Sequence, residues 1–266
     1  MKPLTALVLA GTRSGGDPMA AAADVGHKAL IEIHGRSMIE RVVAALAQSS
    51  SVERIIIAID APDLLSEHPE LRAAAGDKSL TLMSTGEGPS ATVAAALRGE
   101  GTPMLVTTAD HALLQAQWID EFLAACPADA DAVVAMARRE QVQAAVPDTQ
   151  RTYLRFTDGE FSGCNLFLLA RPAASDVVRF WRQLESERKK PLRMIGRLGW
   201  LFALRYRFGR LGLAAAIERL GRLAGGAKLA IVEMNDGRAA VDVDKPRDLE
   251  RVLRLIAADS GTDLRR

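Results

Sequence analysis

The chain has little of what marks secreted, metal-clustered or membrane-spanning proteins. Its 266 residues include only two cysteines, Cys126 and Cys164, with neither the spacing of a metal motif nor the number of a disulfide framework. No stretch reaches the roughly 18 uninterrupted apolar residues that a membrane-spanning helix needs. Gly11 and Arg13 interrupt the first apolar segment, so we expect no signal peptide and a cytoplasmic protein.

An excess of charge is also missing. Lysine and arginine number 34 and the acidic residues 33, which gives a formal net charge of +1. This balance predicts no general affinity for nucleic acid. The four histidines fit no zinc spacing. Two of them, His27 and His111, lie next to candidate site residues, and we expect them to make hydrogen bonds rather than to act in catalysis.

What the chain does contain is an apolar fraction of 48%, enough for a substantial core, distributed over alternating strand-like and helix-like segments. Strands are expected at 4–10, 52–59, 80–83, 103–108 and 132–137, with helices between them. This alternation predicts an α/β fold with a mainly parallel sheet covered on both faces. The length suits one domain over residues 1–266. Ligands of such sheets bind outside the carboxyl ends of the strands.

The second half of the chain is less regular. Strands are expected at 152–156, 161–169, 228–234 and 239–244, and a last helix at 247–257. Between them, residues 188–228 carry eleven basic residues and one acid, Glu218, interleaved with apolar residues at helical spacing. We expect this insert to be a basic amphipathic helical hairpin that breaks near 209–212.

The first strand leads into a loop that suits a polyanion. Ala10, Gly11 and Thr12 follow the strand directly, and a turn at this position leaves backbone N–H groups free to face phosphates. Arg13 and Lys28 would add positive charge from two sides. The loop lacks the Gly-Lys-Ser/Thr ending of a P-loop, and its glycines do not fall as G-x-G-x-x-G.

Three segments of this opening, 9–13, 28–30 and 35–39, resemble the signature of the MobA-like nucleotidyltransferases. They read Leu-Ala-Gly-Thr-Arg, Lys-Ala-Leu and Gly-Arg-Ser-Met-Ile. Thr12 replaces a common second glycine, and the gap before Lys28 is longer than usual. The resemblance implies a Rossmann-like three-layer sandwich with a mainly parallel mixed sheet, of the nucleotidyltransferase kind related to GT-A folds. It also implies that Arg13 and Lys28 are catalytic and that residues 10–13 and Lys28 bind the nucleotide.

Carboxylates follow two of the expected strands. Asp110 ends a buried strand, where it suits Mg²⁺ coordination, although a turn-capping role would also explain it. Asp242 and Asp244 alternate on the strand expected at 239–244 and would share one face. The resemblance implies that Asp110 and Asp244 hold the metal ion, Mg²⁺, and it gives Asp242 a lesser, supporting part.

Two further segments are candidates for substrate contact. Gly88 and Ser90 open an alanine-rich helix where related enzymes meet the nucleobase, but Ser90 is equally explained as a helix cap. Gly163 and Asn165 lie in an apolar strand, where glycine allows close approach and the amide both donates and accepts. This segment resembles the acceptor-binding segment of the family. Cys164 between them is expected to be a buried packing thiol.

These observations together favour a Mg²⁺-dependent nucleotidyltransferase. It would move a nucleoside monophosphate from a triphosphate, with CTP or GTP favoured, to a phosphorylated sugar or polyol, and release pyrophosphate. The alternatives are a nucleotide-sugar-dependent glycosyltransferase and a nucleotide-binding regulator without turnover. The basic insert at 188–228 would make a peripheral contact with the inner face of a membrane, where the product would feed lipid-headgroup or envelope assembly. Alternatively, its apolar stripe would pack on the sheet or form a homodimer, with the arginines solvated or binding an anionic acceptor.

Overall fold

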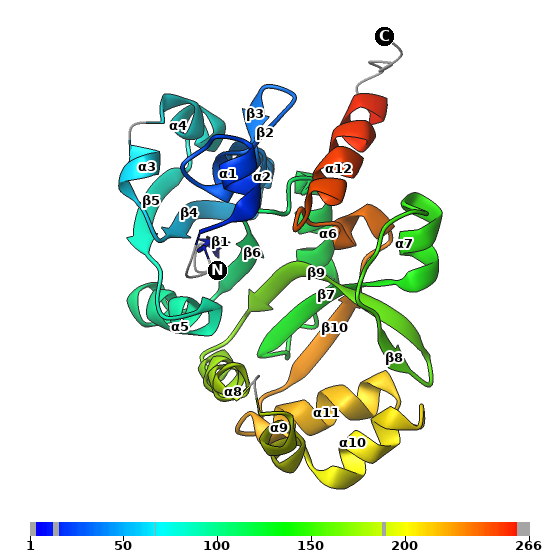
Figure 1. Cartoon of the computed structure of the whole chain (residues 1–266). Coiled ribbons are helices and arrows are strands. Elements are labelled where there is room, and N and C mark those ends of the chain that lie inside the picture. Colours follow the sequence, from blue (N-terminus) through cyan, green and yellow to red (C-terminus); the bar gives the residue numbers. More distant parts are fainter. Residues whose placement is uncertain (1–3, 13–15, 67, 188–189, 260–266) are drawn as a thin grey trace.

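The centre of the protein is a mixed sheet of eight strands. The structure is a computed structural model that describes residues 4–12, 16–66, 68–187 and 190–259 (Figure 1). Along the sheet the strand order is β10-β7-β9-β6-β1-β4-β5, and β8 pairs with β9. β9 runs antiparallel to its neighbours β6, β7 and β8, whereas the other pairs are parallel. The mainly parallel α/β sheet that the sequence predicts is therefore confirmed.

The bounds of the strands agree closely with the hydrophobic pattern over most of the chain. They are β1 Leu4–Ala10, β4 Val52–Ile59, β5 Ser79–Ser84, β6 Met104–Thr108, β7 Ala132–Arg138, β8 Leu154–Phe156, β9 Gly159–Leu169 and β10 Leu229–Glu233. A separate hairpin pairs β2 Glu32–Ile33 with β3 Arg36–Ser37.

Helices connect these strands. They are α1 Pro18–Ala22, α2 Met38–Gln48, α3 Asp63–Ser66, α4 Pro69–Ala75, α5 Pro89–Glu100, α6 Ala116–Ala125, α7 Arg139–Ala145, α8 Ala174–Ser186, α9 Pro191–Leu198, α10 Trp200–Arg207, α11 Leu213–Leu223 and α12 Pro246–Asp259, with short 3₁₀ helices η1 Lys28–Leu30 and η2 Gly237–Ala240. Among the described residues, no helix has both the length and the apolar character needed to cross a membrane.

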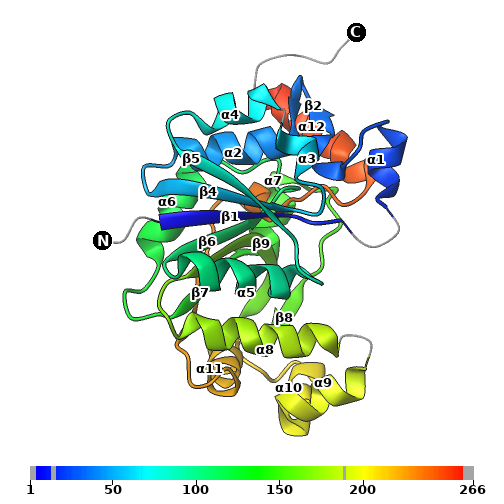
Figure 2. The same cartoon turned by 90° about the vertical axis from the view of Figure 1, so that its left-hand side faces the viewer.

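The helices cover both faces of the sheet and make three layers (Figure 2). On one face lie α2 and α4, and on the other lie α5 and α8. α2 shows how the sequence sets these elements. Ser37 caps the helix by accepting the N–H of Glu40, while Glu40 caps Ser37 in return. The helix then buries Ile39, Val42 and Leu46 along one face, against the larger of two apolar clusters.

The topology brings several chain segments to one edge of the sheet. β1, β4 and β6 are adjacent and parallel, so their carboxyl ends meet at the same edge. The loop from Gly11 follows β1, Asp60 follows β4, and Asp110 lies two residues beyond the end of β6. The first loop and Asp110, both predicted to bind the ligand, therefore lie together at the carboxyl-end edge of the sheet, where Asp60 joins them.

Two predictions about the second half of the chain are wrong. Residues 239–244 do not form a strand. η2 takes residues 237–240, and the segment that follows is bound at Val243, whose N–H donates to the carbonyl of Asp110 rather than to a sheet neighbour. Asp242 and Asp244 consequently do not share a strand face.

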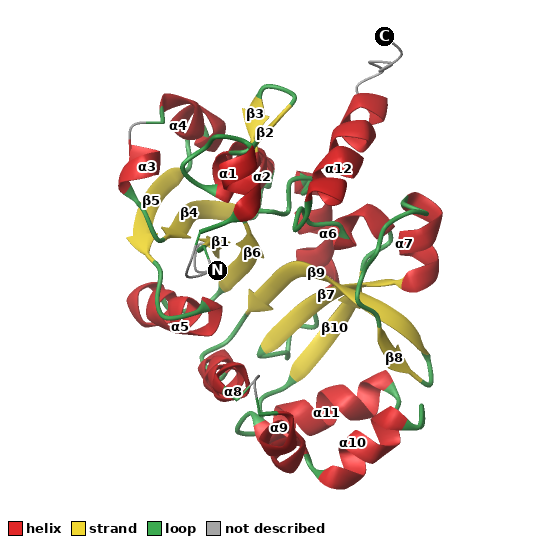
Figure 3. Ribbon diagram, viewed as in Figure 1, coloured by secondary structure: helices red, strands yellow, loops and turns green. Residues whose placement is uncertain are grey.

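The prediction of a two-helix hairpin is also wrong, because the region after Lys190 forms three helices, α9, α10 and α11. Gly199, with φ of 100°, ends α9 and begins α10, a break that the sequence analysis did not foresee. The break expected at 209–212 lies between α10 and α11. Figure 3 shows α9, α10 and α11 below the yellow sheet, at the side where β8 and β10 lie. Arg188 and Lys189, at the start of the predicted insert, lie outside the described residues.

Candidate active site

Lys28 brings two carboxylates together. Its Nζ lies 3.0 Å from Oδ2 of Asp110 and 3.3 Å from Oδ1 of Asp244. Burial alone would lower the pKa of Lys28, but the two carboxylates outweigh this effect and raise the pKa above 10.5. The lysine therefore stays charged at neutral pH. The hydrogen bond from Val243 to the carbonyl of Asp110 holds the two acidic segments next to each other.

The chemistry of this donor set suits a hard divalent cation. Oδ1 of Asp110 is buried and has no hydrogen-bond partner among the described residues, so one carboxylate oxygen is left for a ligand. The described residues contain no group of three or more histidine, cysteine or acidic side chains able to hold a metal ion. Mg²⁺ does not need one, because it commonly binds one or two carboxylates and completes its shell with water and phosphate oxygens. Asp110 and Asp244 fit that requirement.

Thr12 is tied to the end of the neighbouring strand. Its N–H and its hydroxyl both lie 3.2 Å from Oδ1 of Asp60, and its hydroxyl lies 2.8 Å from Nε2 of His27. His27 Nδ1 accepts the N–H of Ala29, so Nε2 of the neutral ring carries the proton. These contacts give a structural role to the threonine that replaces a common glycine. Arg13, the other basic residue predicted here, lies outside the described residues.

The remaining atoms of this first loop lie close to the sheet. Ala10 is buried at the end of β1. A Cβ at Gly11 would lie 3.2 Å from the methyl carbon of Thr85, so a larger residue would press on the segment that follows β5. The environment of Asp60 also stabilises its charged form. Partial burial would raise its pKa, but backbone hydrogen bonds and the neighbouring His27 have the larger combined effect and lower the pKa below 3.8.

The predicted base-binding segment carries a carboxylate that the sequence analysis missed. Ser90 is buried, and its N–H and hydroxyl both donate to Oε2 of Glu185, from α8. A Cβ at Gly88 would lie 2.9 Å from Oε1 of the same carboxylate. Ser90 does not cap α5 with its own side chain. Glu185, 95 residues away in sequence, caps the helix instead, and no local pattern could have revealed this partner.

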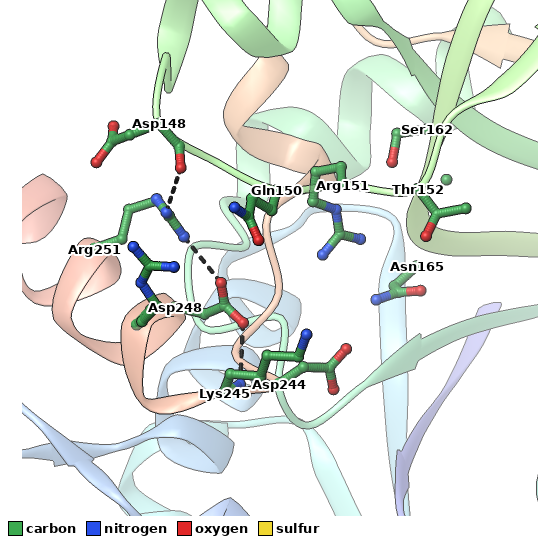
Figure 4. Close-up of a pocket in the computed structure, with 12 residues that line it drawn as sticks. Asp148, Gln150, Arg151, Thr152, Ser162, Asn165, Asp244, Lys245, Asp248 and Arg251 are labelled. Atoms are coloured by element: carbon green, nitrogen blue, oxygen red, sulfur yellow. Dashed lines mark hydrogen bonds and ion pairs between the residues drawn. The ribbon is translucent and has the colours of Figure 1, made fainter.

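A pocket of about 360 Å³ lies beside Asp244 (Figure 4). Its walls come from β9, from the segment before β8 and from the start of α12. They comprise Asp148, Gln150, Arg151, Thr152, Ser162, Gly163, Asn165, Asp244, Lys245, Arg247, Asp248 and Arg251. Four of these side chains are basic and three acidic. Gly163 and Asn165, the two predicted acceptor contacts, both line this pocket, and a Cβ at Gly163 would meet no atom within 4 Å.

Asp242 does not line this pocket itself but contacts two residues that do, Arg151 and Asn165. Arg151 forms a two-pronged ion pair with it, with Nη2 3.0 Å from Oδ2, and Asn165 donates to the same oxygen at 2.8 Å. The supporting metal role that the resemblance gave Asp242 is therefore not what its contacts indicate. Burial lowers the pKa of Arg151, but Asp242 outweighs this and raises it, so the guanidinium stays charged.

Asn165 has an unusual backbone conformation as well as this contact. Its φ is +48°, in the left-handed region that asparagine tolerates better than most residues. The side-chain amide donates to Asp242, and Asn165 itself is at the pocket wall (Figure 4). Neither Arg151 nor Arg251 was among the predicted site residues. Arg251 lies in the helix expected at 247–257, where no local signal marks it, and residues 146–153 show no strand or helix period. Asp148, whose carbonyl accepts from Arg251, lies in the same irregular segment.

His111, next to Asp110, is a packing residue. It is fully buried and stacks on Trp118, with ring centroids 6.3 Å apart. Burial lowers its pKa to about 4 despite the nearby carboxylates, so the ring is neutral at physiological pH. A proton-transfer role near neutral pH would need a pKa closer to 7. Cys164 is likewise buried, and burial raises the pKa of its thiol to about 12.

Comparisons with known proteins agree with this architecture. The model of the MobA-like NTP transferase domain matches residues 6–222. A solved structure described as a hypothetical transferase from Thermus thermophilus is 30% identical, with a TM-score of 0.77. The match covers 94% of this chain and 100% of that one. The chain therefore belongs to the MobA-like NTP transferase family and is a nucleotidyltransferase.

More distant structures share the fold. One, titled CMP:2-keto-3-deoxy-manno-octonic acid synthetase complexed with CTP, is 16% identical with a TM-score of 0.58, and the match covers 97% of this chain and 100% of that one. Another is the 4-diphosphocytidyl-2C-methyl-D-erythritol synthase of Anaerococcus prevotii, 9% identical with a TM-score of 0.59 and 95% coverage of both chains. No curated protein matches the chain.

Proposed function

We propose that this enzyme transfers a nucleoside monophosphate from a triphosphate to a phosphorylated small molecule, with Mg²⁺ as its cofactor. The observation that carries the proposal is the contact of Lys28 with Asp110 and Asp244 beside a pocket with four basic side chains. The cluster of Lys28, Asp110 and Asp244 suits the reacting phosphates of the nucleotide. The pocket suits an anionic acceptor that approaches from the other side.

The reaction is a displacement at phosphorus. An oxygen of the acceptor's phosphate forms a bond to the α-phosphorus, the bond from that phosphorus to the β-phosphate oxygen breaks, and pyrophosphate leaves. Mg²⁺ supplies neutralisation of the phosphate charge when it is bound. Asp110 and Asp244 would hold it. Lys28 would stabilise the charge that builds on the leaving group, and the loop at 10–13, with Arg13, would bind the outer phosphates.

The pocket walls suggest how the acceptor is held. Arg247 and Lys245 offer positive charge to its phosphate, while Asn165 and Ser162 offer hydrogen bonds to hydroxyl groups. Gly163 leaves room for a ligand against β9. A phosphorylated sugar or polyol combines these features. Such products are precursors of lipid headgroups or envelope polymers, which is the use we propose for this one.

CTP and GTP are the triphosphates we favour. Similar folds are named for CTP or for cytidyl products. The resemblance of the chain's opening segments to the family that includes molybdenum-cofactor guanylyltransferase supports GTP. Glu185 lies at the segment of Gly88 and Ser90, which we propose contacts the base. A carboxylate accepts hydrogen bonds from an exocyclic amino group, which cytosine and guanine carry and uracil lacks.

The test is a matrix of the four nucleoside triphosphates against phosphorylated sugars and polyols, with Mg²⁺ present and pyrophosphate detected. Each acceptor is paired with its unphosphorylated form. We expect pyrophosphate only where both a triphosphate and a phosphorylated acceptor are present, and less of it with Arg247→Gln. In a parallel assay with sugar nucleotides in place of the triphosphates, release of nucleoside diphosphate without pyrophosphate would instead identify a glycosyltransferase. Equal rates with unphosphorylated acceptors would contradict the anionic acceptor.

A further inference from the structure

Helix α10 exposes an apolar stripe to solvent. Trp200, Leu201, Leu204 and Phe208 are 65%, 72%, 54% and 66% exposed. Within the part of the chain that the structure describes, five of the nine exposed large apolar side chains lie between Trp200 and Phe208. A gathering of this kind on one element is not the ordinary scatter of surface apolar residues. It marks a surface with a partner.

The stripe is separate from the face that attaches α10 to the protein. At the helical spacing of 100° per residue, the four stripe residues fall within about 100° of the helix circumference. Phe202 and Ala203 point the other way and are half-buried. Tyr206 joins them, with its ring 5.8 Å from that of Phe156 and its hydroxyl accepting the N–H of Arg155 at 3.4 Å. α10 is thus apolar on two opposite faces, and only one of them has a partner.

Arginines border the exposed stripe. By the same spacing Arg207 flanks it on one side and Arg205 on the other, and Arg210 follows just after the helix. None of the three makes an ion pair with any described residue, and Arg205 donates only to the carbonyl of Arg210. From Lys190 to Arg210 there are six basic residues and no acid. The surface therefore combines exposed apolar residues with three arginines that form no ion pair within the described part of the chain.

The position of the helix allows it to meet a flat partner. α9 and α10 lie at the outer edge of the molecule in both views, opposite α4 and α12 (Figures 1 and 2). A second copy of the chain is a poor fit, because a two-fold interface would place this patch against its own image. Arg205, Arg207 and Arg210 would then face like charges, and residues 190–210 contain no acid that could pair with them. An anionic lipid bilayer satisfies both features of the patch.

We infer that α10 is a docking surface for anionic membranes, with Trp200, Leu201, Leu204 and Phe208 inserted among the headgroups and acyl boundary, and with Arg205, Arg207 and Arg210 on the lipid phosphates. The helix lies in the interface and does not cross the bilayer. Tryptophan suits this depth, because its ring has an apolar body and a polar edge. This inference does not depend on the proposed reaction, since α10 supplies no residue to the pocket or to the Lys28 cluster.

Vesicle sedimentation with the full chain tests the docking surface. The vesicles are phosphatidylcholine alone or phosphatidylcholine mixed with phosphatidylglycerol, each at low and high salt. We expect binding to the anionic vesicles and weaker binding as salt rises, because salt screens the arginines. Replacement of Arg205, Arg207 and Arg210 by Gln is expected to weaken partitioning about a hundredfold. The variant Trp200→Ser, Leu204→Ser, Phe208→Ser is expected to weaken it at least about tenfold.

Matched controls separate this surface from general effects. Replacement of Arg36, Arg72 and Arg98 by Gln makes the same change in net charge at exposed positions elsewhere, and Leu64→Ser removes an exposed apolar side chain from α3. Both control proteins should bind as the native protein does. Thermal melting checks that every variant is folded. We expect all of them to fold, because the replaced side chains are exposed.

Three results would overturn the inference. One is the absence of binding by the native protein to anionic vesicles at low salt. Another is equal loss of binding in the α10 variants and their controls. The third is a native dimer that the Trp200, Leu204 and Phe208 replacements convert to a monomer, with no vesicle binding by either form. That last result would assign the stripe to a second copy. None of these outcomes bears on pyrophosphate release by the enzyme in solution.

Discussion

Lys28 Nζ lies 3.0 Å from Oδ2 of Asp110, although 82 positions separate the two residues. The contact crosses the crevice edge of the sheet from η1 to the end of β6, and Asp244 completes it from the segment before α12. A single ammonium thus stabilises two neighbouring carboxylates that would otherwise repel each other. Within the described ranges, the same arrangement leaves Oδ1 of Asp110 without a hydrogen-bond partner, so this oxygen can still accept a ligand.

We predict that Asp110→Asn and Asp244→Asn each lower turnover at least about a hundredfold at saturating Mg²⁺, because each removes charge from the proposed cation site. Asparagine keeps the shape of the side chain, so the fold should persist. Initial rates of pyrophosphate release measure turnover, and circular dichroism checks that the fold persists. Asp77→Asn, at an exposed position remote from the cluster, is the control. Near-native rates in both site variants would contradict the metal assignment.

The position of Asp110 at the crevice edge could be predicted from the sequence because its signal is local. A buried run of five residues from Met104 to Thr108 sets the strand, and the position after a parallel strand is a crevice position in any such sheet. Sequence reasoning failed at Asp242, where the alternation Asp-Val-Asp resembles a strand. The fold places a 3₁₀ turn before that segment instead and pairs Asp242 with Arg151.

What the sequence could not supply were partners from distant elements. Glu185 caps α5 from α8, and Asp60 binds Thr12 from the end of β4. Each contact depends on the packing of two elements that are themselves predictable, but their relative placement is set by the whole sheet and not by any window of residues. The exposure of the α10 stripe could not be predicted either, because helical spacing alone does not show which apolar face of the helix packs against the rest of the protein.

We predict that Lys28→Met increases the affinity for Mg²⁺ in the absence of nucleotide. The ammonium occupies the space between the two carboxylates and repels a cation, so its removal leaves Asp110 and Asp244 unpaired and negative. Thermal melting with and without Mg²⁺ should show a larger stabilisation of the variant than of the native protein. Lys78→Met, at a position outside the cluster, is the control. An unchanged response to Mg²⁺ would separate Lys28 from the cation site.

The same variant should lose catalysis more than binding. We predict that Lys28→Met lowers kcat at least about a hundredfold while KM for the triphosphate rises less, because leaving-group charge develops in the transition state. The raised pKa of Lys28 sets the pH range of its effect. Its contribution to stability is complete below pH 10.5 and is lost as the pH rises through the raised value. A rise in KM alone would make Lys28 a binding residue only.

Arg151 and Asp242 form a charge pair at the pocket that we propose binds the acceptor. Their side chains are only 16% and 9% exposed. We predict that Arg151→Met destabilises the protein by about 3 kcal/mol, because it leaves Asp242 buried without a counter-charge. The double variant Arg151→Met, Asp242→Asn should be more stable than Arg151→Met alone. Urea denaturation measures both. A double variant that is no more stable than Arg151→Met would show that the two side chains do not interact.

Thr12 replaces a glycine that is common in the family, in the loop that we propose binds the phosphates, and its hydroxyl joins this loop to His27 and Asp60. We predict that Thr12→Val, which removes only that hydroxyl, raises KM for the triphosphate about tenfold and leaves kcat nearly unchanged. The reason is that a loop less firmly held must be ordered when the nucleotide binds. Thr12→Ser restores the hydroxyl and should restore KM, whereas a general defect of packing would persist in both variants. The measurement is steady-state kinetics with the triphosphate varied at a fixed, saturating acceptor concentration. A large fall in kcat with KM unchanged would instead assign the hydroxyl to the chemical step.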